Sequence, residues 1–157
     1  RISSKYNLKR RIAYYGNKIR AHKGTDYAAP IGTPIEATAN GTVTESRYAG
    51  GNGNYVKIRH NGTYSTQYLH MSKRAVKVGD YVKQGQTIGY IGMTGNTAGP
   101  HVCYRFWKNG QQVDPLKQKF PNSEPMNKNK VPAYKKYIEP LKIQLDSIEY
   151  PHKNILF

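Results

Sequence analysis

Short apolar runs separated by glycine and proline dominate the first three quarters of the chain. They are rich in Val, Ile, Tyr and Thr and recur at short, regular spacing, as the strands of an antiparallel sheet do. We expect strands at Thr42–Ser46, Asn54–His60, Ser65–His70, Thr87–Ile91 and His101–Trp107. This pattern favours an all-β fold, specifically an antiparallel β-sandwich.

Alternation within these runs predicts which side chains share a face of the sheet. Successive side chains of a strand point to opposite faces, so residues two apart lie on the same side. Thr66, Tyr68 and His70 are therefore expected on one face of their strand. By the same rule, His101 and Cys103 point the same way from theirs.

The pattern changes towards the C-terminus. Residues 117–132 are polar, contain three prolines, and are predicted to be a linker after a domain that spans residues 1–116. The extension that follows, residues 133–157, has apolar side chains at helical spacing as far as residue 148. Pro140 interrupts this spacing, so we expect either a kink or two short helices. A helix that packs on the domain or on a partner explains this segment.

Charge narrows the range of functions. Lys and Arg total 25 against 9 Asp and Glu, a formal net charge of +16, which favours a polyanionic partner such as nucleic acid or an anionic cell wall. No nucleic-acid-binding motif is present and the basic residues are scattered through strands and turns, so we expect no nucleic-acid partner. A glycosidase that needs two facing acids is hard to assemble, because carboxylates are rare in residues 1–116. They are Asp26, Glu36, Glu45, Asp80 and Asp114.

Cysteine content and hydropathy set further limits. Cys103 is the only cysteine, so no intrachain disulfide can form. No apolar run approaches the ~18 residues of a membrane span. The chain begins at Arg1 rather than Met, so we expect a processed form from which any export or anchoring segment has been removed.

Three of the five histidines lie in sequences that suit a metal ion. His22 precedes Asp26 by four residues, and His70 ends a predicted strand. His101 shares a strand face with Cys103. Imidazole, carboxylate and thiolate are ligands that zinc takes, and three protein ligands leave a fourth position for water, as in catalytic zinc sites.

Motifs around these residues follow one another in a characteristic order. They are Arg1-Ile-Ser-Ser, His22-Lys-Gly-Thr-Asp26-Tyr-Ala-Ala-Pro, Tyr68-Leu-His70-Met-Ser, Gly92-Met-Thr-Gly-Asn-Thr-Ala-Gly-Pro-His101 and Val113-Asp114-Pro115. Over residues 1–116 the chain thus resembles a lysostaphin-like (LytM-type) zinc metallopeptidase domain. The resemblance implies a β-sandwich of the duplicated hybrid motif type. A weak internal repeat fits this, because residues 31–35 and 78–82 both read apolar-Gly-x-x-apolar.

The resemblance also implies roles for the site residues. His22 and Asp26 would be zinc ligands, and His70 and His101 would lie beside the bound water. One of these two histidines would help to deprotonate the water. The other would stabilise or protonate the tetrahedral intermediate.

The sequence departs from the family at the third ligand. The usual His-x-His-Phe-Glu reads His101-Val-Cys103-Tyr-Arg105, so Cys103 takes the ligand position and Arg105 an acidic one. Cys103 retains the strand parity and can bind zinc as a thiolate. Upstream, Tyr14 or Tyr15 would donate to the oxyanion.

Two functions are consistent with these features. The first is a zinc endopeptidase that hydrolyses peptide cross-links or stem peptides of bacterial peptidoglycan, exported to the periplasm or cell envelope. The second is a catalytically inactive LytM-like module that binds cell wall or activates another wall hydrolase. Degenerate relatives of the second kind usually lack several site residues, whereas one is altered here, so the sequence favours the enzyme.

Overall fold

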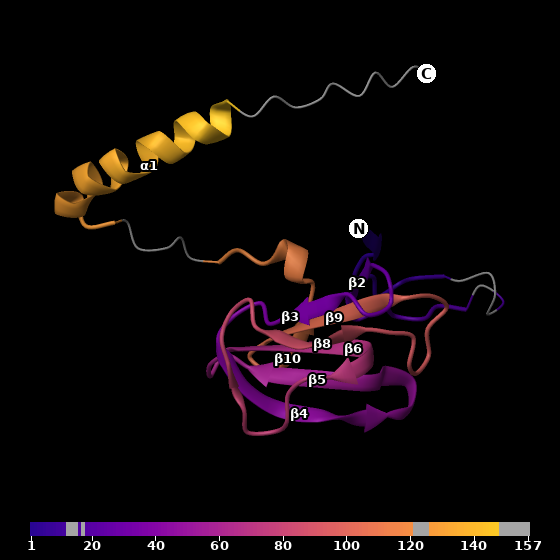
Figure 1. The fold of residues 1–157 in the computed structure, drawn as a ribbon. Coiled ribbons are helices and arrows are strands. Elements are labelled where there is room, and N and C mark those ends of the chain that lie inside the picture. The colour runs from indigo at the N-terminus through magenta and orange to yellow at the C-terminus, as the bar shows by residue number, and fades with distance from the viewer. Residues whose placement is uncertain (12–15, 17, 121–125, 148–157) are drawn as a thin grey trace, which may run out of the picture. The chain divides into compact units, whose positions relative to one another are not determined.

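The computed structural model describes residues 1–11, 16, 18–120 and 126–147, and the chain divides into two compact units. The first unit is Arg1–Gln118 and the second Lys119–Phe157. Figure 1 shows that the first unit is built of strands and that the second contains a helix. The linker and extension boundaries read from composition stay a prediction.

Ten strands, all paired in antiparallel fashion, form a single folded sheet in the described part of the first unit. The predicted all-β antiparallel class is confirmed, and β4, β5, β6, β8 and β9 correspond to the expected strands. The others, two to four residues long, are too short to show alternation. The strands are β1 (Ile2–Ser4), β2 (Thr25–Ala28), β3 (Pro34–Glu36), β4 (Gly41–Ala49), β5 (Gly53–Arg59), β6 (Tyr64–Arg74), β7 (Tyr81–Val82), β8 (Thr87–Ile91), β9 (His101–Lys108) and β10 (Gln111–Val113).

The sheet folds into two layers because strand β6 belongs to both. Strands follow the order β1-β2-β9-β6-β5-β4-β7, while the last part of β6 pairs instead with β8, which pairs with β3. Side chains of β4, β5 and β6 pack against those of β3, β7 and β8 in the main core. Each buried Val or Ile contributes roughly 1.5–3 kcal/mol, so this contact holds the layers together. The core residues are Ile35, Ala37, Val43, Val56, Ile58, Tyr68, Met71, Val82, Ile88 and Ile91.

A β-bulge in β6 changes the direction of one histidine. Leu69 and His70 together lie opposite the single residue Tyr55 of β5, and His70 has a left-handed φ of 64°. Tyr68 before the bulge and Met71 after it both face the main core. The extra residue thus turns His70 away from the face of Tyr68. The prediction that these two side chains share a face is wrong.

The second unit contains one α-helix, α1 (Val131–Asp146), which follows a 3₁₀ turn at Lys128–Lys130. The helix continues through Pro140, so the alternative of two short helices is wrong. None of the helix residues is buried within the chain. Among the described residues, no helix combines the length and apolar character needed to cross a membrane. Residues 148–157, the end of the predicted extension, lie outside the described part.

Candidate active site

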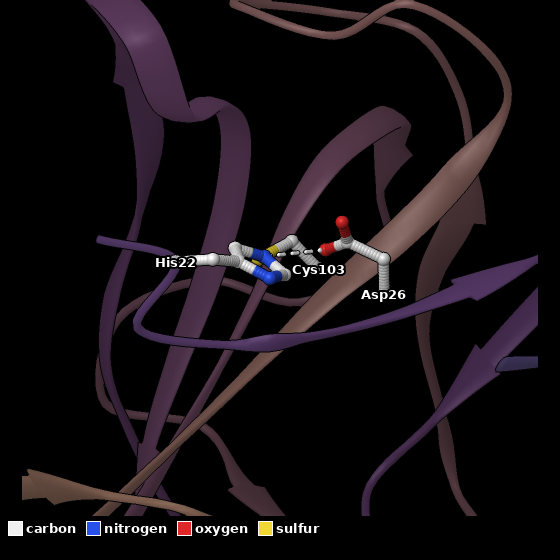
Figure 2. A group of neighbouring side chains, drawn as sticks. All are labelled: His22, Asp26 and Cys103. Carbon is white, nitrogen blue, oxygen red and sulfur yellow. Dashed lines mark hydrogen bonds and ion pairs between the residues drawn. The ribbon is translucent and has the colours of Figure 1, made fainter. Parts of the chain in front are cut away.

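His22, Asp26 and Cys103 converge, as Figure 2 shows. Cys103 points away from the main core, because its neighbours Val102 and Tyr104 pack against that core. Asp26 of β2 pairs directly with Cys103 of β9, so both side chains leave the sheet on the same side. His22 precedes β2 and is held by a bridge to Asn7, whose N–H and C=O both bond to its backbone. The Nε2 of His22 lies 3.0 Å from Oδ1 of Asp26 and 3.6 Å from Sγ of Cys103.

This cluster has the dimensions of a metal site. One nitrogen, one oxygen and one sulfur atom all lie within 4.8 Å of one another. Zinc bonds of about 2.0–2.3 Å in tetrahedral geometry place ligand atoms roughly 3.3–3.8 Å apart. Small adjustments of these distances would therefore accommodate zinc and leave one position open. His22 and Cys103 are only 9% and 4% exposed, which keeps competing water away from two of the donors.

Three histidines present the same ring nitrogen to the site. Nδ1 contacts a backbone carbonyl in each: Lys5 for His22 at 3.0 Å, Thr94 for His70 and Gly99 for His101, both at 2.8 Å. A carbonyl oxygen only accepts, so Nδ1 carries the hydrogen and donates it. Nε2 is therefore the ring nitrogen left to bind a metal or exchange a proton, and in His22 and His101 it faces Oδ1 of Asp26.

His70 and His101 lie side by side next to this cluster. Their ring centroids are 4.9 Å apart, and Nε2 of His101 is 3.6 Å from Oδ1 of Asp26. Burial lowers the pKa of His70, against the opposing effect of its bond to Thr94, and the charge of His101 lowers it further. His70 is therefore neutral at neutral pH and able to accept a proton.

A loop after β8 holds His70 in its unusual backbone conformation. The hydroxyl of Thr94 accepts a hydrogen bond from the backbone of Asn54 at 2.9 Å and donates one to the carbonyl of Met71 at 2.8 Å. The loop approaches so closely that a Cβ at Gly53 would lie 2.3 Å from the Thr94 carbonyl oxygen. The bulge and this loop together fix the position of His70.

Burial raises the pKa of both remaining donors, but their net pKa shifts are opposite. For Asp26, burial raises the pKa, but hydrogen bonding and charge from His22 outweigh it, so the pKa lies below its usual value. For Cys103, burial and the neighbouring Asp26 raise the pKa to about 12, although Arg105 acts in the opposite direction. Without metal, the site thus holds a carboxylate and a thiol. Binding zinc through Cys103 would release a proton.

The cluster opens into a large cleft. Its volume is about 1300 Å³, and it is lined by the three donors, both other histidines and the loop of residues 95–100. This volume is ample for a peptide segment of several residues.

Comparison with known proteins assigns the family. The model of peptidase family M23 matches residues 20–115. The chain belongs to peptidase family M23. The predicted resemblance to a LytM-type domain is confirmed.

Relatives of this M23 domain agree in sequence and fold. Peptidoglycan DD-endopeptidase ShyC of Vibrio cholerae is 50% identical over 124 residues, which are 79% of this chain and 28% of ShyC. A zinc-containing peptidase from Vibrio cholerae has a TM-score of 0.73 at 40% identity, covering 77% of this chain and 37% of that one. The catalytic domain of lysostaphin from Staphylococcus simulans has a TM-score of 0.65 at 34% identity, covering 74% and 89%. The chain thus spans less than a third of ShyC.

The M23 domain brings together all five residues singled out in the sequence, and their roles stay a prediction. Tyr14 and Tyr15 lie outside the described residues. Sequence reasoning missed Ser4, whose hydroxyl lies 3.2 Å from Nδ1 of His22, and also Gly24 and Thr94. Each lies within one of the family motifs, those that begin at Arg1, His22 and Gly92, and this position was the only sequence signal for it. Their structural contacts could not be read from that signal.

Proposed function

We propose that this M23 domain is a zinc-dependent endopeptidase that hydrolyses peptide cross-links or stem peptides of bacterial peptidoglycan. One observation carries the proposal: three metal-binding atoms lie within 4.8 Å of one another, beside two histidines whose Nδ1 atoms are each bonded to a backbone carbonyl. The name of ShyC, a peptidoglycan DD-endopeptidase, supports this substrate.

The donor set fits a catalytic zinc ion. His22 through Nε2, Asp26 through Oδ1 and Cys103 through Sγ would hold it. When bound, zinc would polarise the scissile carbonyl and lower the pKa of a bound water towards ~7.

His70 and His101 would carry the proton. With Nδ1–H bonded to a backbone carbonyl, each ring can accept a proton at Nε2 and later give it up. One ring would take the proton from the attacking water, and the other, when protonated at Nε2, would donate a hydrogen bond to the developing oxyanion. Returning the proton to the leaving amine completes the hydrolysis of the peptide bond.

The charge of the chain suits the same substrate. A formal net charge of +16 favours an anionic surface, and the bacterial cell wall is one. A peptidoglycan hydrolase acts where the wall is, so we place the protein in the periplasm or cell envelope. Nucleic acid is not proposed as a partner.

Digestion of purified peptidoglycan tests this function. The protein should release soluble peptide fragments, detected by chromatography and mass spectrometry. A chelator should stop the release and added zinc should restore it. The His101→Ala protein serves as the matched inactive control. If the wild-type protein binds the wall and releases no fragment with zinc present, the non-catalytic module replaces this proposal.

A further inference from the structure

Cationic side chains line the cleft around the metal-binding cluster. They are Arg10, Arg20, Lys23 and Arg105. Asp26 is the only carboxylate among the described lining residues, and it is also a proposed zinc ligand. Once Asp26 binds a metal, the described lining contains no other carboxylate. Such a cleft attracts an anionic ligand.

Arg105 lies on the same strand as the proposed zinc ligand Cys103. It follows Cys103 by two residues on β9, so both side chains leave the same face of the strand. Gly24 of the neighbouring segment leaves room for it, since a Cβ there would lie 3.2 Å from Cγ of Arg105. Because Gly24 has no side chain, Arg105 fits beside it.

The guanidinium of Arg105 is incompletely bonded. Its Nε is buried and has no hydrogen-bond partner among the described residues, and Arg105 forms no ion pair there. Its interaction with the thiol of Cys103 leaves this Nε unsatisfied. Leaving a buried donor unpaired is unfavourable, and native proteins rarely do so without a ligand or a functional reason. A guanidinium binds a carboxylate well, because two N–H groups match its two oxygens.

Arg10 repeats this feature elsewhere in the cleft. Its Nε is likewise buried without a partner among the described residues, and its Nη1 lies 3.4 Å from the hydroxyl of Ser4. Ser4 in turn contacts His22. Two arginines with unsatisfied donors therefore line the same cleft, on segments that are far apart in sequence.

We propose that Arg105 binds a free carboxylate of the substrate, so that this domain selects anionic peptides. The proposal rests on the proposed endopeptidase function and specifies its substrate. Two residues of β9 span about 7 Å, the length of two residues of extended peptide. The recognised carboxylate therefore lies within about two residues of the scissile bond. Arg10 adds positive charge to the same cleft.

The test uses one substrate in two chemical forms. A soluble cross-linked stem-peptide dimer is prepared with its carboxyl groups free or converted to carboxamides, and kcat/KM is measured for both with zinc-loaded protein. The monomeric stem peptide, which contains no cross-link, is used in the same two forms for calorimetric binding. Arg105→Gln removes the charge, and Arg105→Lys retains it without the paired N–H groups. Lys108→Gln is the matched control, because Lys108 is exposed at the end of the same strand and outside the cleft.

The wild-type protein should prefer the free-acid form by about 10- to 100-fold, the range of a charge-assisted hydrogen-bonded pair. Arg105→Gln should lose most of this preference while its zinc content stays unchanged, and Arg105→Lys should retain part of it. Lys108→Gln should behave as wild type.

Three results would overturn the inference. The first is a wild-type protein that treats acid and amide alike, and the second is an Arg105→Gln protein that still distinguishes them. The third is an Arg105→Gln protein that loses zinc and loses activity equally on both substrate forms, which would mean that Arg105 acts through Cys103. If no dimer is cleaved but the binding preference depends on Arg105, the endopeptidase function fails and the carboxylate site stands.

Discussion

Replacing Gly24 with alanine would test the position of Cys103 without altering any proposed ligand. A Cβ at Gly24 would lie 2.7 Å from Sγ of Cys103, 3.0 Å from the carbonyl oxygen of Tyr104 and 3.2 Å from Cγ of Arg105. The backbone of Gly24 is not in the left-handed region, so alanine adds a methyl group and no conformational strain. Any effect therefore comes from the contact itself.

The size of the effect follows from these distances. Non-bonded atoms of this size approach favourably to about 3.5–4.0 Å, so Sγ must retreat by roughly 1 Å. A zinc–sulfur bond is about 2.3 Å long, and a displacement of this size removes most of it. We expect zinc affinity to fall by at least the 10- to 100-fold typical of disturbed ligand support. The overpacked strand pair should also lose about 1–3 kcal/mol of unfolding free energy.

Zinc affinity would be measured by competition with a chromophoric chelator, and stability by urea unfolding of the metal-free protein. Gly62→Ala is the matched control, because a Cβ at Gly62 has no atom within 4 Å and Gly62 also lies outside the left-handed region. It should leave affinity unchanged and stability within about 0.5 kcal/mol. Should Gly24→Ala lose stability yet bind zinc as tightly as wild type, Cys103 is not a ligand and the reasoning fails.

Three further predictions concern the site and its support. Cys103→Ser should lose most of its zinc, because a neutral hydroxyl is a poor ligand, whereas Cys103→His should keep it; zinc stoichiometry decides, and full zinc content in the serine variant contradicts the assignment. His70→Ala and His101→Ala should abolish peptide release with zinc still bound, and an empty metal site in either would contradict the division of roles. Tyr55→Phe removes the hydrogen bond that most lowers the pKa of Glu45, and should cost about 1 kcal/mol at pH 7. Because the folded pKa of Glu45 lies below its ordinary value of 4.5, this stabilisation is present above pH ~4.5 and lost as pH falls, so wild type and variant should converge in urea unfolding near pH 3. An equal difference at both pH values would refute this reasoning.

Much of the fold could be predicted because strong patterns are local. Strands of five residues or more alternate long enough to be recognised, as β5 and β9 do. The short strands β1, β2, β3, β7 and β10 exist because a longer neighbour offers them backbone partners. The helix α1 continues through Pro140 although the local sequence favours an interruption.

The sequence by itself determined the chemistry of the candidate site. His22, Asp26, Cys103, His70 and His101 were recognisable because their side-chain types and motif order persist in one dimension. Strand parity also placed His101 and Cys103 on one face, and the β2–β9 pairing then brings Asp26 to that same face.

Only the tertiary structure decided how His70 reaches that site. Period-two alternation assigns it to the face of Tyr68, and the bulge opposite Tyr55 moves it to the other. The loop around Thr94, bonded to Asn54 and His70, holds it there. A bulge depends on the register of two strands and on a third segment packed over them. These contacts join residues 17 to 40 positions apart, so no local pattern of hydrophobic and polar residues encodes them.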